Sequence, residues 1–272
     1  MTAATPARPA SPRAAPRRDL TGAIGRIAPP LLVFLAAIAI WEVATAGPGR
    51  RVIPPPSAIM SAMGREQELL LKAALATFTE ALGGLAIGTI AGILVGFATA
   101  RWAVARDILV PLAVGASTIP LIAIAPIIGN WFGVLNPLSK MMMAALLVFF
   151  PIVINVIRGL VEVQPAQLEL MRSYAASESV VLRKVRVPNM LPFLFTALKV
   201  AATLAFIGAI VAEYFGGTSA VIGRVVLTSM SSGSFDVAWA GILIGALGAM
   251  AAYIVVVVVE RLVIPWSPSL RT

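Results

Sequence analysis

The chain of 272 residues is 59% hydrophobic, whereas a soluble domain is usually about 45–50% apolar, so the composition indicates an integral membrane protein. The sequence contains no cysteine and no histidine, which excludes disulfides, thiolate chemistry and metal sites that need imidazole ligands. A net charge of +9 is typical of membrane proteins with basic cytoplasmic segments, and without a basic stripe interleaved with aromatics we expect no nucleic-acid partner.

Residues 1–27 are rich in alanine, proline and arginine and show no apolar periodicity, which predicts a disordered basic tail. The apolar residues 28–46 follow. They exceed the about 7–15 residues of a signal-peptide core and include Glu42, so we expect an uncleaved first membrane span. Residues 47–56 form a Gly/Pro turn, and an amphipathic stretch that suits the membrane interface begins at Ser57.

The second predicted span, residues 78–100, carries a glycine at every fourth position. At this spacing the glycines share one face of a helix, and the lack of side chains there lets a neighbouring backbone approach closely. We therefore expect them to pack helices together rather than to contact a substrate. The four positions are Gly84, Gly88, Gly92 and Gly96.

The third predicted span, residues 108–128, contains three prolines and is the first candidate for lining a translocation path. Proline frees backbone carbonyls and bends helices, which is tolerated inside a membrane only against protein or a water-filled cavity. Polar side chains in other spans extend this set, although a polar residue that bonds within or between helices is the commoner case. The candidate path residues are Ser117, Thr118, Pro120, Asn155 and Thr203.

Three further spans are expected over residues 138–157, 191–212 and 237–259, which gives about six spanning helices in all. Lys199 lies inside the fifth span and is expected to extend its ammonium group towards the interface. An even number of spans places both termini on one side of the membrane. Most lysines and arginines lie in segments on that side, so we expect both termini and residues 162–188 in the cytoplasm.

Residues 162–188, which we call the charged segment, interrupt the apolar spans. Their pattern predicts two short helices around a tight turn, with Pro165 at the first position of one helix and Ser177 as the cap of the other, which Pro188 ends. Exposed apolar side chains beside a turn of small residues would make a knob that fits a groove of a partner. On composition alone a passive solvated loop remains the alternative.

The spacing within the charged segment resembles the EAA loop of ABC-importer permeases, in which Glu-Ala-Ala is followed at fixed intervals by Gly, Ile and Leu-Pro. Here Glu169-Leu170-Met171 stands for the triplet, Ala175 for the glycine, Val185 for the isoleucine and Val187-Pro188 for the last pair. Alanine at the glycine position implies either a right-handed turn or about 1 kcal/mol of backbone strain.

From this resemblance we expect ten residues to couple the chain to an ATPase. They are Glu169, Leu170, Met171, Arg172, Tyr174, Ala175, Ala176, Ser177, Val185 and Pro188. Flanking stretches, such as residues 119–140 and 149–160, look like the nitrate, sulfonate and taurine branch of these permeases, and the resemblance extends over about residues 53–266.

The resemblance implies an all-α integral membrane protein with the MetI-like permease fold. Residues 28–266 would form the permease domain, residues 159–190 its cytoplasmic coupling loop and residues 267–272 a closing tail. It also implies a bacterial inner-membrane location, a translocation path between two copies of the chain or two permease chains, and an extracytoplasmic binding protein. That protein would deliver a small solute such as a sulfonate, taurine, nitrate, a pyrimidine, a thiamine precursor or riboflavin.

The resemblance further implies a cytoplasmic P-loop ATPase dimer that binds ATP and magnesium. The chain itself contains no G-x-x-x-x-G-K-[ST] loop, so we expect it to bind no cofactor and to hydrolyse no ATP. The alternative function is an ATP-independent secondary transporter or channel, whose typical signs are paired intramembrane acids or inverted repeats. Glu42 and Glu80 are the acids within spans, but both are expected near span ends, and no repeat is recognised.

Overall fold

The computed structural model describes residues 20–47, 52–218 and 220–266, and within these ranges every regular element is a helix. Most of the predicted basic tail and the closing residues 267–272 lie outside the described residues. The chain divides into two units, residues 1–46 and residues 47–272, which are described separately.

The first unit contributes one described helix, α1 (Leu20–Thr45). Residues Ala28–Thr45 of this helix are long and apolar enough to cross a membrane, as expected for the first span. The helix begins at Leu20, earlier than the expected start at residue 28, because apolar side chains already recur at helical spacing in the sequence before the prolines.

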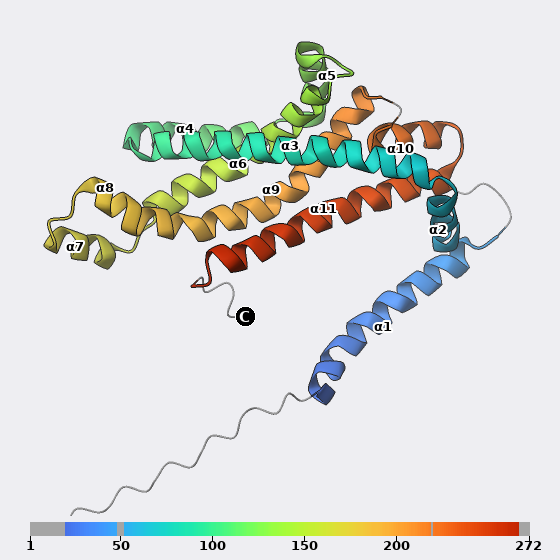
Figure 1. Ribbon diagram of the computed structural model, residues 1–272, viewed down its shortest axis with the longest axis horizontal. Coiled ribbons are helices and arrows are strands. Elements are labelled where there is room, and N and C mark those ends of the chain that lie inside the picture. The colour runs from blue at the N-terminus through green and yellow to red at the C-terminus, as the bar shows by residue number, and fades with distance from the viewer. Residues whose placement is uncertain (1–19, 48–51, 219, 267–272) are drawn as a thin grey trace, which may run out of the picture. The chain divides into compact units, whose positions relative to one another are not determined.

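The second unit is a bundle in which α3, α6, α9 and α11 run side by side (Figure 1). Helices α7 and α8 lie at one end of the bundle, which we call the coupling end, and α2 and α10 lie at the other, which we call the opposite end. The helices of this unit are α2 (Pro56–Arg65), α3 (Gln67–Ala100), α4 (Ala103–Ser117), α5 (Leu121–Phe132), α6 (Pro137–Val161), α7 (Pro165–Ser173), α8 (Glu178–Val181), α9 (Val187–Phe215), α10 (Ile222–Ser231) and α11 (Phe235–Val263).

The third predicted span is replaced by two short helices. α4 ends at Ser117 and α5 begins at Leu121, because Pro120 has no N–H to donate and restricts the residue before it. Figure 1 shows α4 running back from the coupling end and α5 continuing to the end where α6 begins. The described helices that are long and apolar enough to cross a membrane therefore number five, and the α4–α5 pair takes the place of a sixth.

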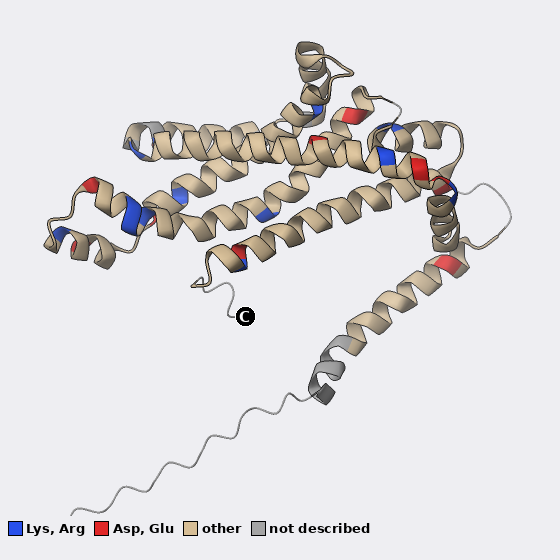
Figure 2. Cartoon of the chain, viewed as in Figure 1, with Lys and Arg blue, Asp and Glu red and all other residues tan. Residues whose placement is uncertain are grey.

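Other helices exceed the predicted spans. α3 begins at Gln67 rather than at residue 78. The amphipathic stretch after Ser57 divides near Glu66, where its first part forms α2 and its second part forms the first turns of α3. The fifth span is part of one long run of helix, Glu178–Phe215, in which α8 passes through a π-helical turn into α9. Charged residues are found in these polar extensions, as the coloured positions at both ends of the bundle in Figure 2 show.

The contact between α3 and α6 is built on the glycines of α3. A Cβ atom at Gly84 would lie 2.4 Å from the Cβ of Ala144, and one at Gly92 would lie 2.7 Å from Cγ2 of Ile152. Real side chains do not approach so closely, so only glycine lets the two helices meet here. Gly88 and Gly96 make the same kind of contact with α6. Since this row continues for most of α3, the pair packs closely along much of its length.

The core continues from this pair through α9 to α11. Ala201, Ala205 and Ala209 are fully buried along one face of α9. The rings of Phe78 and Phe206 meet edge to face, with centroids 5.0 Å apart, against the backbone of Gly248. Small residues and one aromatic pair thus join three helices of the bundle.

Candidate functional site

The charged segment projects at the coupling end as α7, a turn and α8 (Figures 1 and 2). α7 begins with Pro165 in its first turn, as predicted, and none of its residues is buried. Leu170 and Tyr174 are 55% and 74% exposed. The ten predicted coupling residues therefore lie in one continuous segment, in which Leu170 and Tyr174 are open to a partner, whereas Met171, Val185 and Pro188 are half-buried.

The turn between α7 and α8 is a Schellman motif. The N–H of Ala176 donates to the carbonyl of Met171 at 3.0 Å, and the N–H of Ala175 donates to that of Arg172 at 2.9 Å. Ala175 has φ of 46° and is the one non-glycine residue with positive φ in the described part of the chain. Of the two geometries expected for this alanine the left-handed one is present, and it carries about 1 kcal/mol of strain.

The second helix of the charged segment differs from the prediction. Ser177 occupies the N-cap position of α8, but its hydroxyl forms no capping bond and lies instead 3.1 Å from that of Ser179. Pro188 does not end the helix. The chain widens into the π-helical turn Leu182–Arg186, which contains Val185, and this shift in hydrogen bonding accommodates Pro188 in the first turn of α9.

Side chains that were not predicted as site residues anchor the base of the charged segment. Nδ2 of Asn189 donates to the carbonyls of Gly159 at 2.8 Å and Glu162 at 3.0 Å, and Nη1 of Arg186 donates to that of Leu160 at 3.3 Å. These bonds satisfy carbonyls at the C-terminus of α6, which have no partner within the helix. The entry to the segment and its exit are therefore tied together.

The candidate path residues are not joined to one another by any hydrogen bond of the described side chains. Thr118, Asn155 and Thr203 each donate to a carbonyl of their own helix region, at 2.7, 2.9 and 2.8 Å. Pro120 is the N-cap of α5, and the side chain of Ser117 lies outside the described residues.

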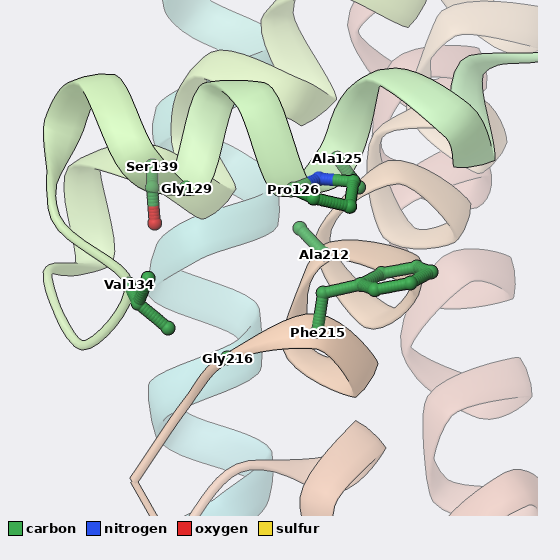
Figure 3. Close-up of a pocket in the computed structure, with 8 residues that line it drawn as sticks. All are labelled: Ala125, Pro126, Gly129, Val134, Ser139, Ala212, Phe215 and Gly216. Atoms are coloured by element: carbon green, nitrogen blue, oxygen red, sulfur yellow. The ribbon is translucent and has the colours of Figure 1, made fainter.

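A cavity of about 120 Å³ opens between α5, the start of α6 and the end of α9 (Figure 3). Phe215 and Ala212 of α9 face Pro126 of α5, and Ser139 supplies a hydroxyl. Of the candidate path residues whose side chains are described, Thr118, Pro120, Asn155 and Thr203, none lines it. The lining residues are Ala125, Pro126, Gly129, Val134, Ser139, Ala212, Phe215 and Gly216.

Three charged residues are buried near this cavity's end of the bundle. Glu80, Lys140 and Glu213 are 4%, 2% and 0% exposed and come from α3, α6 and α9. The sequence led us to expect Glu80 at the interface. It is enclosed instead, because α3 continues past it towards the opposite end and its neighbours cover it. The Lys140 ammonium donates to the Val134 carbonyl at 2.5 Å.

A further group of charged residues, a lysine and a glutamate, joins α9 to α11. Nζ of Lys199 in α9 is 2.5 Å from Oε2 of Glu260 in α11, and the Glu260 side chain is only 2% exposed. An acid on the neighbouring helix, three residues before the end of α11, is thus the partner of Lys199, and the reach of Lys199 towards the interface stays a prediction.

Comparison with known proteins identifies the family. The binding-protein-dependent transport system inner membrane component family matches residues 84–266. A probable ABC transporter permease protein of Haemophilus influenzae is 30% identical over 80% of this chain and 89% of its own length. The formylaminopyrimidine transport permease protein ThiX of Halalkalibacterium halodurans is 31% identical, over 87% of this chain and 95% of its own.

A putative aliphatic sulfonates transport permease protein, SsuC of Bacillus subtilis, is 30% identical over 88% of this chain and 87% of its own length. These matches confirm the resemblance that the charged segment indicated. They imply an inner-membrane protein that works with an ATPase and a substrate-binding protein, and in which ATP hydrolysis belongs to a separate partner. The chain belongs to the inner-membrane permeases of binding-protein-dependent ABC transport systems, of the sulfonate and taurine type.

Proposed function

We propose that this chain pairs with a second copy of itself to form the translocation path of an ATP-driven importer for a small solute. A cytoplasmic P-loop ATPase dimer, which binds ATP and magnesium, would receive α7 of each copy in a groove. An extracytoplasmic binding protein would deliver the solute at the opposite end. In this arrangement both termini of the chain lie in the cytoplasm.

The observation that carries the proposal is the exposed α7 with the strained turn at Ala175. A solvated loop has no need of a left-handed alanine, whereas a docking helix benefits from a turn that presents it in one orientation. Tyr174, which is 74% exposed, stands directly beside this turn. Such an aromatic side chain is a typical anchor for a protein interface.

Movement of α7 would reach the path through α6. The base of the charged segment is bonded to the end of α6 by Asn189, and α6 is packed along the glycines of α3. Closely packed helices move as units rather than deform. We therefore propose that closure of the ATPase dimer displaces α6 and α3 together and alternates access to the path.

The solute class is proposed from the relatives and the cavity. The names of the relatives specify formylaminopyrimidine, riboflavin and aliphatic sulfonates. All eight residues that line the cavity are uncharged, and most are apolar. This lining favours a solute with an apolar or heterocyclic part, although nitrate and taurine remain within the range of the family resemblance.

Reconstitution with the ATPase and binding protein of the same transport system tests the proposal. Glu169→Lys reverses a charge on α7 and is expected to abolish ATPase association and ATP-dependent uptake in proteoliposomes. Glu68→Lys makes the same change on an exposed residue of α3 at the opposite end and serves as the control. Full association and uptake in Glu169→Lys would contradict the docking role, and uptake by the unmodified chain without ATP would favour the secondary transporter.

A further inference from the structure

α10 begins without a cap from its own sequence. Its N-cap residue is Val221, which offers no side-chain acceptor, and the first helical residues are Ile222 and Gly223. The first four N–H groups of a helix have no partner within it, and a buried N–H without a partner is costly. Since Ile222 and Gly223 are both buried, their N–H groups need acceptors from elsewhere in the protein.

The acceptors come from two other helices. The N–H of Ile222 donates to Oγ1 of Thr77 in α3 at 3.0 Å, and the N–H of Gly223 donates to Oε2 of Glu213 in α9 at 2.5 Å. The Thr77 hydroxyl in turn donates to Oε1 of Glu213 at 2.7 Å. Thr77 and Glu213 are both completely buried. α10 therefore has a cap in trans, made by α3 and α9 together.

The first residues of α10 are closely packed against the residues that cap it. A Cβ atom at Gly223 would lie 2.7 Å from both the Cβ of Glu213 and the carbonyl oxygen of Ile210. The start of α10 thus rests directly on α9. On its other side α10 packs against α11, where a Cβ atom at Gly241 would lie 3.0 Å from Val226.

Charges around the cap connect it to α6. Glu80 interacts electrostatically with both Glu213 and Lys140. Lys140 is itself held by the carbonyls of Val134 and Asn136 in the turn before α6. The N-terminus of α10 also carries a partial positive charge, which offsets the charge of a carboxylate placed against it.

We propose that Thr77 and Glu213 are positioning residues that hold α10 against the bundle in one state of the transport cycle and release it in another. A cap within α10 would move with the helix. A cap built from α3 and α9 persists only while these two helices keep their spacing, because a hydrogen bond weakens steeply beyond its normal length. α10 would therefore respond to a change in the spacing of α3 and α9 at the opposite end, away from the bonds of Asn189 that hold α6 and α9 together at the coupling end, and change the opposite end of the path accordingly. The release step depends on the proposed ATP-driven function, whereas the docking of α10 by this cap does not.

Distance measurements between spin labels test the proposal, since the chain has no cysteine of its own. One label pair at Leu82→Cys and Met230→Cys, both exposed, reports on α3 and α10, and a second pair at Leu82→Cys and Leu138→Cys reports on α3 and α6. Labelled chains are diluted with unlabelled chains so that only distances within one chain contribute.

Thr77→Val removes the hydroxyl at nearly constant volume and is expected to broaden the α3–α10 distances while the α3–α6 distances stay unchanged. The ratio of docked to released α10 should fall on the order of tenfold. Thr79→Val is the matched control, because the Thr79 hydroxyl is exposed and bonds only to its own helix. Thr77→Ser keeps the hydroxyl and should preserve the original distances, and Glu213→Gln should broaden them as Thr77→Val does.

Unchanged α3–α10 distances in both Thr77→Val and Glu213→Gln would overturn the cap. If Thr77→Val broadens the distances of both label pairs, Glu213→Gln and Thr77→Ser show whether the cap or the general packing was lost. Broadening in Thr77→Ser equal to that in Thr77→Val would then contradict the cap. In the assembled transporter, trapping the ATPase with ATP should shift the α3–α10 distances of the unmodified chain, and no shift would refute the release step. Failure of ATP-driven uptake would refute the proposed function alone, because the cap is measured without nucleotide.

Discussion

The side-chain amide of Asn189 in α9 donates a 2.8 Å hydrogen bond to the carbonyl oxygen of Gly159 in α6. The contact joins the two ends of the charged segment at the point where a Cβ atom on Gly159 would lie 2.6 Å from Cα of Met190. A displacement of α7 therefore moves both α6 and α9, because no flexible hinge separates α7 from them.

Asn189→Leu should uncouple ATP hydrolysis from transport. The variant leaves the carbonyls of Gly159, in α6, and of Glu162, directly after α6, without this donor, so the base of the charged segment loosens while α7 itself is unchanged. We expect the ATPase to associate and hydrolyse ATP, with solute uptake per ATP reduced on the order of tenfold. Gln164→Leu is the control, since Gln164 is exposed and makes no capping bond. Equal reductions in both variants would argue against a specific role of Asn189.

Ala175→Gly should stabilise the protein. Glycine adopts positive φ without a steric cost, so the variant is expected to gain about 1 kcal/mol in the free energy of unfolding. Ala175→Val should lose stability, because a branched side chain resists this conformation. Thermal unfolding of the purified protein measures both, and Ala176→Gly, at a position without positive φ, should bring no such gain. A destabilised Ala175→Gly variant would contradict the geometry of the turn.

Gly88→Ala should weaken the contact between α3 and α6. The added Cβ would lie 2.5 Å from the carbonyl oxygen of Ala145, and overpacking of this kind typically costs about 1–3 kcal/mol. Gly115→Ala is a matched control on α4, because nothing lies within 4 Å of the added atom. It is expected to be neutral or stabilising, as alanine favours helix. If the two variants unfold at the same temperature, the close packing of α3 on α6 is not required for stability.

Lys199→Met should destabilise the bundle strongly. It leaves the buried carboxylate of Glu260 without its partner, and the loss of one partner from a buried pair costs about 3 kcal/mol or more. Replacing Glu260 by leucine as well should recover much of this loss, since no charge then remains buried. Lys72→Met breaks the exposed pair with Glu68 and should cost under about 0.5 kcal/mol. Additive effects of Lys199→Met and Glu260→Leu would show that the pair contributes no coupling.

Much of the architecture could be predicted from local patterns. The length and apolarity of the runs predicted the spanning helices, and the spacing of Gly84, Gly88, Gly92 and Gly96 predicted a face on which another helix could pack. The resemblance of residues 169–188 to the EAA loop located the turn at Ala175. These features depend on the order of neighbouring residues, which the sequence displays directly.

The contacts between distant helices could not be predicted in the same way. The pairing of Lys199 with Glu260 and the cap made by Thr77 and Glu213 depend on which helices are neighbours in space, and periodicity within one helix carries no such information. Asn189 was missed because a polar residue after a proline is also typical of an ordinary loop. The break at Pro120 was visible as a bend, but whether a proline bends or divides a helix depends on the surrounding packing.

Cross-linking of the charged segment to the ATPase tests the central claim most directly. A photoreactive reagent attached at Tyr174→Cys, on the exposed aromatic position beside the turn, should form a covalent bond with the ATPase in the assembled transporter. The same reagent at Trp131→Cys, which is also 74% exposed but lies at the end of α5, should not. A cross-link from position 174 alone is the result that we predict, and its absence, or an equal yield from position 131, would contradict the assignment of α7 as the helix that couples this permease to ATP hydrolysis.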